Sequence, residues 1–155
     1  VWSWAIIHRQ ITVAGFGGMI MLRSVKAQDY MCEDLITFTP ETDLFVAINK
    51  LLDYRITGAP VIDANGALVG LLSEADCLKA ILTLTYHEEE MGGYVGTYMT
   101  PEVHTVNHDA DIIKVAEEFI HNKRRRLPVV KDGKLIGQIS RRDVLRAVEK
   151  FEMDG

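Results

Sequence analysis

The stretch Leu68-Val69-Gly70-Leu71-Leu72-Ser73-Glu74-Ala75-Asp76 decides the fold, because it returns as Leu135-Ile136-Gly137-Gln138-Ile139-Ser140-Arg141-Arg142-Asp143. Each copy reads as an apolar strand with an internal glycine that runs into a helix. In each copy a serine at the junction precedes an aspartate by three residues. We expect this junction to be both the hinge of the fold and the ligand site.

The similarity between the two halves extends on either side of this stretch. Met31 matches Met99 at an offset of 68 residues (99 − 31 = 68). After the hairpin turn the offset is 67, as for Ser73 and Ser140 (140 − 73 = 67). The single gap falls in a loop, where a change of length costs little free energy. The chain therefore reads as a duplicated small domain.

The repeat sets the expected domain boundaries. We predict a leader over 1–24 that is non-native or disordered, a first repeat over 25–84, a linker over 85–95, a second repeat over 96–150 and a tail over 151–155. In the leader, the uncharged run 11–22 is too short to span a bilayer and lacks the features of a secretory signal. Translation is expected to begin at Met19 or Met21, and a short membrane-surface anchor is the alternative.

Each half reads as β-α-β-β-α. In the first half we expect a strand at 36–38, a helix from Pro40 to about Tyr54 capped by Thr39, a hairpin over 61–72 and a helix that begins after Ser73. The second half repeats this order. Its expected buried helix positions are Ile112, Val115, Ala116, Phe119 and Ile120, then Val144, Leu145, Ala147 and Val148. One half has too few apolar positions to bury a core alone, so two halves are expected to pack as one module.

Composition narrows the class of protein. The chain has 155 residues, of which 48% are hydrophobic, and a net charge of −5. This acidity argues against general nucleic-acid binding, which needs a basic surface. The only cysteines, Cys32 and Cys77, form neither a disulfide framework nor a metal-binding pattern, so a reducing cytoplasm is expected. His87 with Glu88 to Glu90 reads as a solvated linker rather than a metal site, because consecutive carboxylates do not converge.

Six segments carry a family resemblance. They are Tyr30-Met31, Gly58-Ala59-Pro60-Val61-Ile62-Asp63, residues 70–76, Tyr98-Met99-Thr100-Pro101, Arg126-Leu127-Pro128-Val129-Val130 and residues 137–143. In this order and at these offsets they resemble a tandem pair of cystathionine-β-synthase (CBS) domains, the Bateman module. The resemblance covers about Val25 to Val148. It implies an α+β (α/β) fold of two pseudo-symmetric repeats, and a non-catalytic sensor of AMP, ADP, ATP or S-adenosylmethionine with no obligatory cofactor.

The Ser-x-x-Asp junction has a chemistry of its own. A serine at a helix N-cap leaves free N–H groups pointing outward, and such a helix end attracts anions, phosphate above all. An ionised aspartate in the first turn is acceptor-only and could accept both hydroxyl protons of a ribose. The same spacing is also close to a capping box, which would stabilise any helix start.

The resemblance implies that each ligand cleft is shared between the halves. One cleft would join Ser140 and Asp143 to Ile56, Thr57, Gly58 and Ala59, with Ile36 and Asp29 nearby. The other would join Ser73 and Asp76 to Arg124, Arg125, Arg126 and Leu127, with His104 and Thr97 nearby. The arginine run and Arg141 could contact phosphate, or could form a solvated edge. Glu74 would repel a polyphosphate near the first motif.

Three classes of function remain open at this point. The first is a nucleotide-sensing homodimer that acts on an unknown regulated protein, with dimer faces on the helices around 44–52 and 77–84. The second is a protein-interaction scaffold whose clefts stay empty. The third, an enzyme, lacks a recognisable set of catalytic residues, because His8, His87, His104, His108 and His121 are scattered. Neither a membrane nor a nucleic-acid partner is expected.

Overall fold

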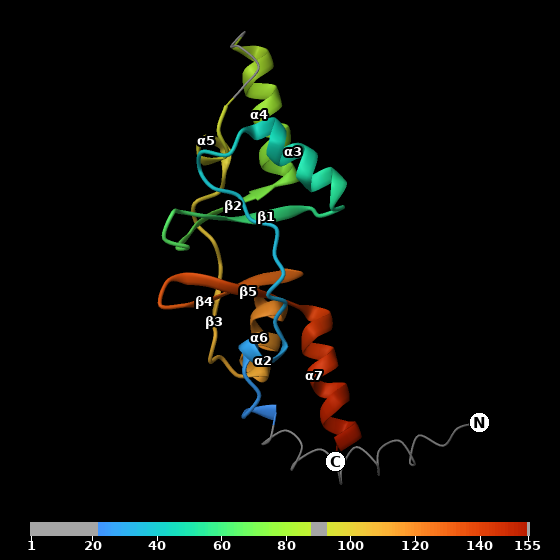
Figure 1. The fold of residues 1–155 in the computed structure, drawn as a ribbon. Coiled ribbons are helices and arrows are strands. Elements are labelled where there is room, and N and C mark those ends of the chain that lie inside the picture. Colours follow the sequence, from blue (N-terminus) through green and yellow to red (C-terminus); the bar gives the residue numbers. More distant parts are fainter. Residues whose placement is uncertain (1–21, 88–92, 155) are drawn as a thin grey trace, which may run out of the picture. The chain divides into compact units, whose positions relative to one another are not determined.

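The computed structural model describes residues 22–87 and 93–154, which divide into two compact units (Figure 1). Unit 1 consists of the residues up to Cys32, Val106–Val129 and the residues from Gln138 onward. Unit 2 consists of Glu33–Thr105 and Val130–Gly137. Residues 1–21 and 88–92, which include most of the predicted leader and the acidic part of the predicted linker, lie outside the described residues.

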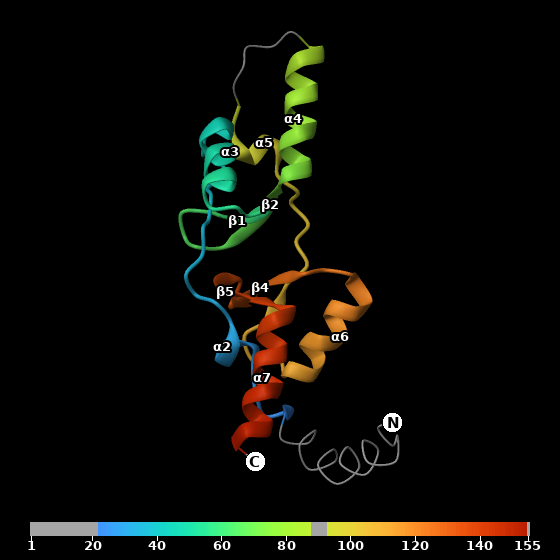
Figure 2. The same ribbon diagram turned by 90° about the vertical axis from the view of Figure 1, so that its right-hand side faces the viewer.

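Unit 2 is built on the antiparallel hairpin of β1 (Gly58–Ile62) and β2 (Leu68–Ser73). The helices α3 (Leu44–Asp53) and α4 (Glu74–Tyr86) lie over the same face of this hairpin (Figure 2). Phe38 bridges to Val61 at one edge of the hairpin, and α5 (Val95–Tyr98) is a single helical turn. The helices therefore cover one face of a small sheet, as in an α+β fold.

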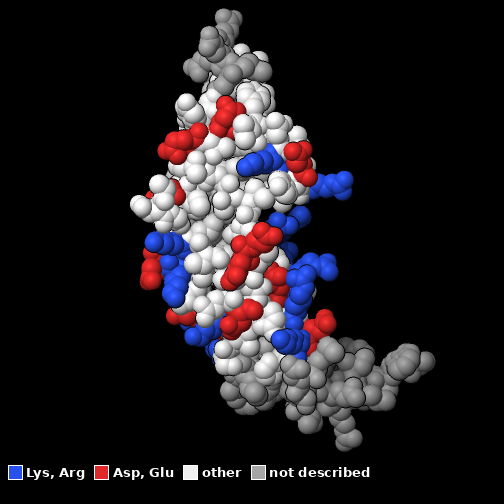
Figure 3. Space-filling model, in the orientation of Figure 1, with Lys and Arg blue, Asp and Glu red and all other residues white. Residues whose placement is uncertain are grey.

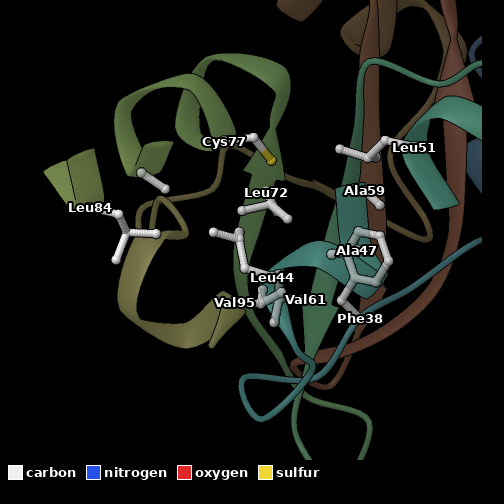
Figure 4. Close-up of a cluster of buried hydrophobic side chains, with 11 residues drawn as sticks. Phe38, Leu44, Ala47, Leu51, Ala59, Val61, Leu72, Cys77, Leu84 and Val95 are labelled. Carbon is white, nitrogen blue, oxygen red and sulfur yellow. The ribbon is translucent and has the colours of Figure 1, made fainter. Parts of the chain in front are cut away.

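The space between the hairpin and its helices is the core of unit 2 (Figure 4). Full burial of a Val, Leu or Phe side chain in this core stabilises the fold by roughly 1.5–3 kcal/mol relative to leaving it exposed to water. Cys77 takes part in the core as a small apolar group, with 7% of its surface exposed. The cluster consists of Phe38, Leu44, Ala47, Leu51, Ala59, Val61, Leu72, Cys77, Ala80, Leu84 and Val95.

Unit 1 repeats this arrangement around a sheet of order β3-β4-β5. The strands of this sheet are β3 (Val106–Asn107), β4 (Arg126–Lys131) and β5 (Lys134–Ser140), of which the part Val130–Gly137 is assigned to unit 2. Its helices are α2 (Ala27–Tyr30), α6 (Ile112–Asn122) and α7 (Arg141–Asp154). The buried apolar residues include Ile112, Val115, Phe119, Leu127, Val129, Ile139, Val144 and Ala147.

The lead-in segments of the two repeats are exchanged. The first lead-in segment, Val25–Cys32, belongs to unit 1, where the N–H of Cys32 donates to the carbonyl of Gln138 in β5 (2.8 Å). The second, Gly93–Thr100, belongs to unit 2, where the N–H of Thr100 donates to the carbonyl of Leu71 in β2 (2.9 Å). In each bridge the strand residue returns a hydrogen bond of 2.9 Å. The second strand of each hairpin, β2 or β5, thus pairs with the lead-in segment of the other repeat.

The same exchange joins each lead-in segment to the helix of the other repeat. The N–H of Val95 donates to the carbonyl of Thr42, just before α3 (2.9 Å), and the N–H of Ala27 donates to that of Ala110, just before α6 (2.8 Å). Ala27 and Val95 occupy equivalent positions in the two repeats (95 − 27 = 68). The contacts of one unit therefore reproduce those of the other.

The structure confirms both predicted hairpins and the four long helices, and it changes three details. Asp43, and not Thr39, caps α3, because its carboxylate accepts the N–H groups of Phe45 (2.9 Å) and Val46 (3.1 Å). Instead, the N–H of Thr39 donates to the hydroxyl of Thr42 in the preceding turn. The strand predicted at 36–38 is reduced to the bridge at Phe38.

The third change concerns exposure. Several apolar side chains that helical spacing predicts to be buried are exposed, because each helix meets its sheet through a face narrower than its apolar stripe. These are Ile120 in α6, and Leu145 and Val148 in α7. No helix among the described residues is both long enough and apolar enough to cross a membrane.

Gly70 is required by the approach of the second lead-in segment. A Cβ atom at this position would lie 2.6 Å from Met99 Sδ and 3.0 Å from the carbonyl oxygen of Thr100. We predict that Gly70→Ala lowers the free energy of unfolding by about 1–3 kcal/mol, as overpacking does, measured by urea denaturation. Adding Met99→Ala should recover part of the loss. Equal stability of Gly70→Ala and wild type would contradict this account.

Cys77 should be the slower of the two thiols to react. Burial raises the pKa of the Cys77 thiol, and the carboxylates of Asp76 and Glu74 raise it further. Because only the thiolate reacts, we predict that a disulfide reagent modifies the exposed Cys32 first, with Cys32→Ser and Cys77→Ser assigning the two phases. Since the folded-state pKa is the higher one, the contribution of Cys77 to stability is present at neutral pH and is lost as the pH rises through that pKa. Equal rates for the two thiols would contradict the prediction.

Candidate functional site

The first Ser-x-x-Asp motif forms a capping box where β2 runs into α4. The hydroxyl of Ser73 accepts the N–H of Asp76 (3.2 Å). Asp76 Oδ2 in return accepts the N–H of Ser73 (2.9 Å) and its hydroxyl (3.0 Å). Asp76 is 8% exposed, which makes it a buried carboxylate whose donors replace water.

Thr100 adds a third group to this carboxylate. Its Oγ1 lies 3.1 Å from Asp76 Oδ1 and 3.3 Å from Oδ2, and donates to them. The bridge between Thr100 and Leu71 holds the hydroxyl in place. Sequence reasoning missed this contact. The only available signal was Thr100 in the Met99-Thr100-Pro101 segment of the family resemblance, and nothing in that segment pointed to an aspartate 24 residues earlier.

The second motif has the same geometry where β5 runs into α7. Asp143 Oδ2 accepts the N–H (2.8 Å) and the hydroxyl (2.9 Å) of Ser140, whose oxygen accepts the N–H of Asp143 (3.2 Å). The remaining oxygen, Oδ1, pairs with Arg146 Nη1 at 2.7 Å. The Arg146 side chain is 63% exposed and that of Asp143 is 13% exposed. In both motifs Oδ2 accepts the N–H and the hydroxyl of the capping serine, and the further donor to the carboxylate is Thr100 in the first motif and Arg146 in the second.

The residues just before the equivalent proline of each repeat, 56–59 before Pro60 and 124–127 before Pro128, lie beside the Ser-x-x-Asp motif of their own repeat. The N–H of Glu74 donates to the carbonyl of Thr57 (2.9 Å), and Gly58 pairs with Ser73 in the β1–β2 register. In the second repeat, Arg141 donates from its N–H to the carbonyl of Arg125 (3.3 Å) and from Nε to that of Arg124 (2.8 Å). These carbonyl groups each hold one internal hydrogen bond already.

The predicted clefts each combine residues of unit 1 with residues of unit 2, so their assembly stays a prediction. Ser140, Asp143, Arg125, Arg126, Leu127 and Arg141 belong to unit 1, and Ser73, Asp76, Ile36, Ile56, Thr57, Gly58, Ala59, Thr97 and His104 belong to unit 2.

Burial separates these candidates into two groups. Ala59 and Leu127 are each only 1% exposed, while Ile36 and Ile56 pack against the core of unit 2. The exposed candidates are Thr57, Thr97, His104, Arg125, Arg126 and Arg141.

The charges around the two motifs are opposite. The exposed side chain of Glu74 lies within the first motif, whereas Arg141 and Arg142 lie within the second and are both exposed. Figure 3 shows basic and acidic side chains interspersed over the face in view. The basic groups at the second motif suit an anionic ligand better than the acidic first motif does. No cluster of three or more potential metal ligands occurs among the described residues.

Comparison with known proteins identifies the two repeats. The family model for the CBS domain matches residues 27–83 and 95–150. The chloroplastic protein CBSX1 of Arabidopsis thaliana is 34% identical over 148 residues, which span 79% of this chain and 63% of CBSX1. An inosine-5′-monophosphate dehydrogenase of Methanocaldococcus jannaschii is 32% identical over 142 residues, but the match spans only 27% of that enzyme. The chain thus spans less than two thirds of these relatives.

Solved structures agree with this finding. The crystal structure of CBSX2 in complex with AMP is 34% identical, with a TM-score of 0.71 over 83% of this chain and 98% of the other. The CBS domain pair of MJ0100 is 23% identical, with a TM-score of 0.64 over 81% of this chain, which shows a shared fold. Two matched repeats and these structural relatives lead to one conclusion. The chain belongs to the CBS-domain family and is a tandem CBS pair, or Bateman module.

Proposed function

We propose that the chain is a non-catalytic regulatory module that binds an adenosine-containing ligand, namely AMP, ADP, ATP or S-adenosylmethionine. The observation that carries the proposal is the duplicated Ser-x-x-Asp capping box at the N-termini of α4 and α7. A relative that is 34% identical binds AMP in its crystal structure, which supports the same ligand class here.

The geometry of the second motif suits such a ligand. The N-terminus of α7 offers a positive helix end for a phosphate, and Arg141 and Arg142 add guanidinium groups beside it. The carboxylate of Asp143 can accept ribose hydroxyl groups. The adenine-contacting residues predicted from the family resemblance, among them Ile56 to Ala59, remain part of the proposal.

Binding should raise thermal stability. With a ligand at roughly 100 times its dissociation constant we expect about 2.7 kcal/mol of added stability, measured as a shift in melting temperature with AMP, ADP, ATP and S-adenosylmethionine. Asp143→Asn keeps the size of the side chain but loses the charge that ribose hydroxyl groups bind. We expect it to weaken binding by roughly tenfold or more.

Asp109→Asn is the matched control, because it removes the same charge from an exposed turn residue of the same unit. Its ligand-induced shift should equal that of the wild type. Wild-type protein that shows no shift with any of the four ligands would contradict the proposal.

A protein-interaction scaffold is the second candidate, and the surface of α4 favours it. Leu78, Ile81, Leu82 and Tyr86 are 66%, 41%, 55% and 79% exposed. Their spacing places them on one side of the helix. A contiguous apolar stripe of this kind is typical of an interface, and we propose that it forms the contact of a homodimer.

A charge within this stripe should separate the dimer. We predict that Leu82→Glu shifts the chain from dimer to monomer in sedimentation-velocity ultracentrifugation, because a buried unpaired carboxylate is costly. Thr83→Glu introduces the same group at an exposed position beside the stripe and should leave the dimer intact. A wild-type monomer at high micromolar concentration would exclude this interface.

The remaining partners follow from the same proposal. A regulatory module acts on another polypeptide or domain, whose identity we leave open. A reducing compartment such as the cytoplasm accords with two cysteines of which neither forms a disulfide. The acidic net charge of −5 disfavours a nucleic-acid partner.

A further inference from the structure

Five arginines of unit 1 lie close together in two segments, and we call them the arginine surface. Arg124 and Arg125 precede β4, which begins at Arg126, while Arg141 and Arg142 begin α7. The N–H of Arg141 donates to the carbonyl of Arg125 (3.3 Å), and its Nε donates to that of Arg124 (2.8 Å). These two hydrogen bonds join the segments. All five side chains are exposed.

No carboxylate of the described residues neutralises this surface. Within residues 22–87 and 93–154, none of the five guanidinium groups forms an ion pair, and the nearest ion pair along α7 joins Arg146 to Asp143. Like charges this close repel one another, so an anion that comes between them is favoured. The neighbouring Lys123 is not counted, because it ends α6, where a cation also interacts favourably with the helix dipole.

The fold does not require these arginines, as the first repeat demonstrates. In that repeat the N–H of Glu74 donates to the carbonyl of Thr57 (2.9 Å). The same main-chain hydrogen bond joins Arg141 to Arg125 in the second repeat. A matching main chain thus forms without a basic side chain, which indicates that the arginines serve binding. The equivalent residues of the first repeat, at offsets of 68 (124 − 56) and 67 (141 − 74), are Ile56, Thr57, Gly58, Glu74 and Ala75.

Exposed aliphatic side chains accompany the arginine surface. Leu145 is 66% exposed and follows Arg141 by four residues, which places both side chains on one side of α7. Ile120 is 78% exposed and lies in the last turn of α6, a helix that contacts α7. A partner that covers this area therefore meets both guanidinium groups and apolar side chains.

The chemistry of the surface fits an acidic polypeptide better than a nucleic acid. Guanidinium groups pair with carboxylates through two parallel hydrogen bonds, and clusters of arginine recognise acidic motifs. Nucleic acids bind surfaces on which aromatic side chains stack against the bases. Among the described residues of unit 1, the exposed large apolar side chains are all aliphatic. The net charge of −5 also repels a long polyanion.

We propose that the arginine surface binds an acidic segment of another polypeptide, in which apolar residues are interspersed among glutamates or aspartates. The carboxylates pair with the arginines, and the apolar side chains cover Leu145 and Ile120. This inference goes beyond the proposed function, because it concerns a macromolecular partner and requires no bound nucleotide.

Fluorescence anisotropy with a labelled peptide of Glu-Glu-Leu repeats tests the proposal in the absence of nucleotide. The wild-type chain should bind this peptide at low ionic strength, and added salt should weaken binding severalfold because it screens exposed charges. Arg125→Thr combined with Arg142→Ala introduces the residues of the first repeat and should weaken binding by about tenfold or more. Each single substitution should weaken it less, and circular dichroism verifies that every variant is folded.

Two further variants separate a defined surface from overall charge. Arg23→Ala combined with Lys114→Ala removes the same charge from exposed positions of unit 1, with Lys114 in the first turn of α6, away from the arginine surface. This control should bind as the wild type does. Leu145→Ser should weaken binding of the Glu-Glu-Leu peptide and leave binding of a Glu-Glu-Gly peptide unchanged.

Three results would overturn the inference. They are a wild-type chain that does not bind the Glu-Glu-Leu peptide, a control that loses as much affinity as the double arginine variant, and tighter binding of oligothymidylate than of the peptide. Equal effects of Leu145→Ser on the two peptides would exclude the apolar contact. Because no nucleotide is present, each of these results leaves the proposed function standing. A chain that binds none of the adenosine ligands would equally leave this inference intact.

Discussion

The structure depends on the exchange of lead-in segments between the repeats. The second strand of each hairpin would otherwise present an unpaired edge, which invites pairing with other chains. Thr100 pairs with β2 and Cys32 with β5, each through two main-chain hydrogen bonds. Gly70 has no side chain, and this leaves room for Met99 and Thr100 to lie against β2. The compact units consequently do not coincide with the repeats in the sequence.

This exchange also determines the chemistry of the candidate site. It carries the hydroxyl of Thr100 to Asp76, a residue of the other repeat, and thereby gives a buried carboxylate an additional donor. At Asp143 the corresponding oxygen pairs with an exposed arginine of the same helix. Two motifs with the same spacing thus acquire different surroundings.

The exposed apolar side chains follow from the shape of the units. A small sheet covered on one face by two helices contacts only one side of each helix. The apolar stripe of α4 is wider than that side, so Leu78 and Leu82 remain in solvent while Cys77 and Leu84 are buried. Side chains of this size at a helix surface are costly for an isolated chain, and the cost disappears when a second surface covers them. The exposed apolar residues of α4 are therefore accounted for by the homodimer interface that we propose.

The sequence by itself determined the duplication, the hairpins, the helices and the paired serine and aspartate. Hairpin turns, helical periodicity and the Ser73 and Ser140 caps are signals within a few residues, and local signals can be read from a linear chain. The cap of α3 was assigned to the wrong residue because Thr39 and Asp43 are both plausible caps, and only the geometry favours Asp43. Which lead-in segment pairs with which strand, and hence the contact of Thr100 with Asp76, was decided by the tertiary structure alone. The exposure of Ile120 and Leu145 was decided there too. Periodicity shows which apolar residues share one face of a helix. Which partner covers that face depends on long-range packing, and long-range packing has no fixed spacing in the sequence.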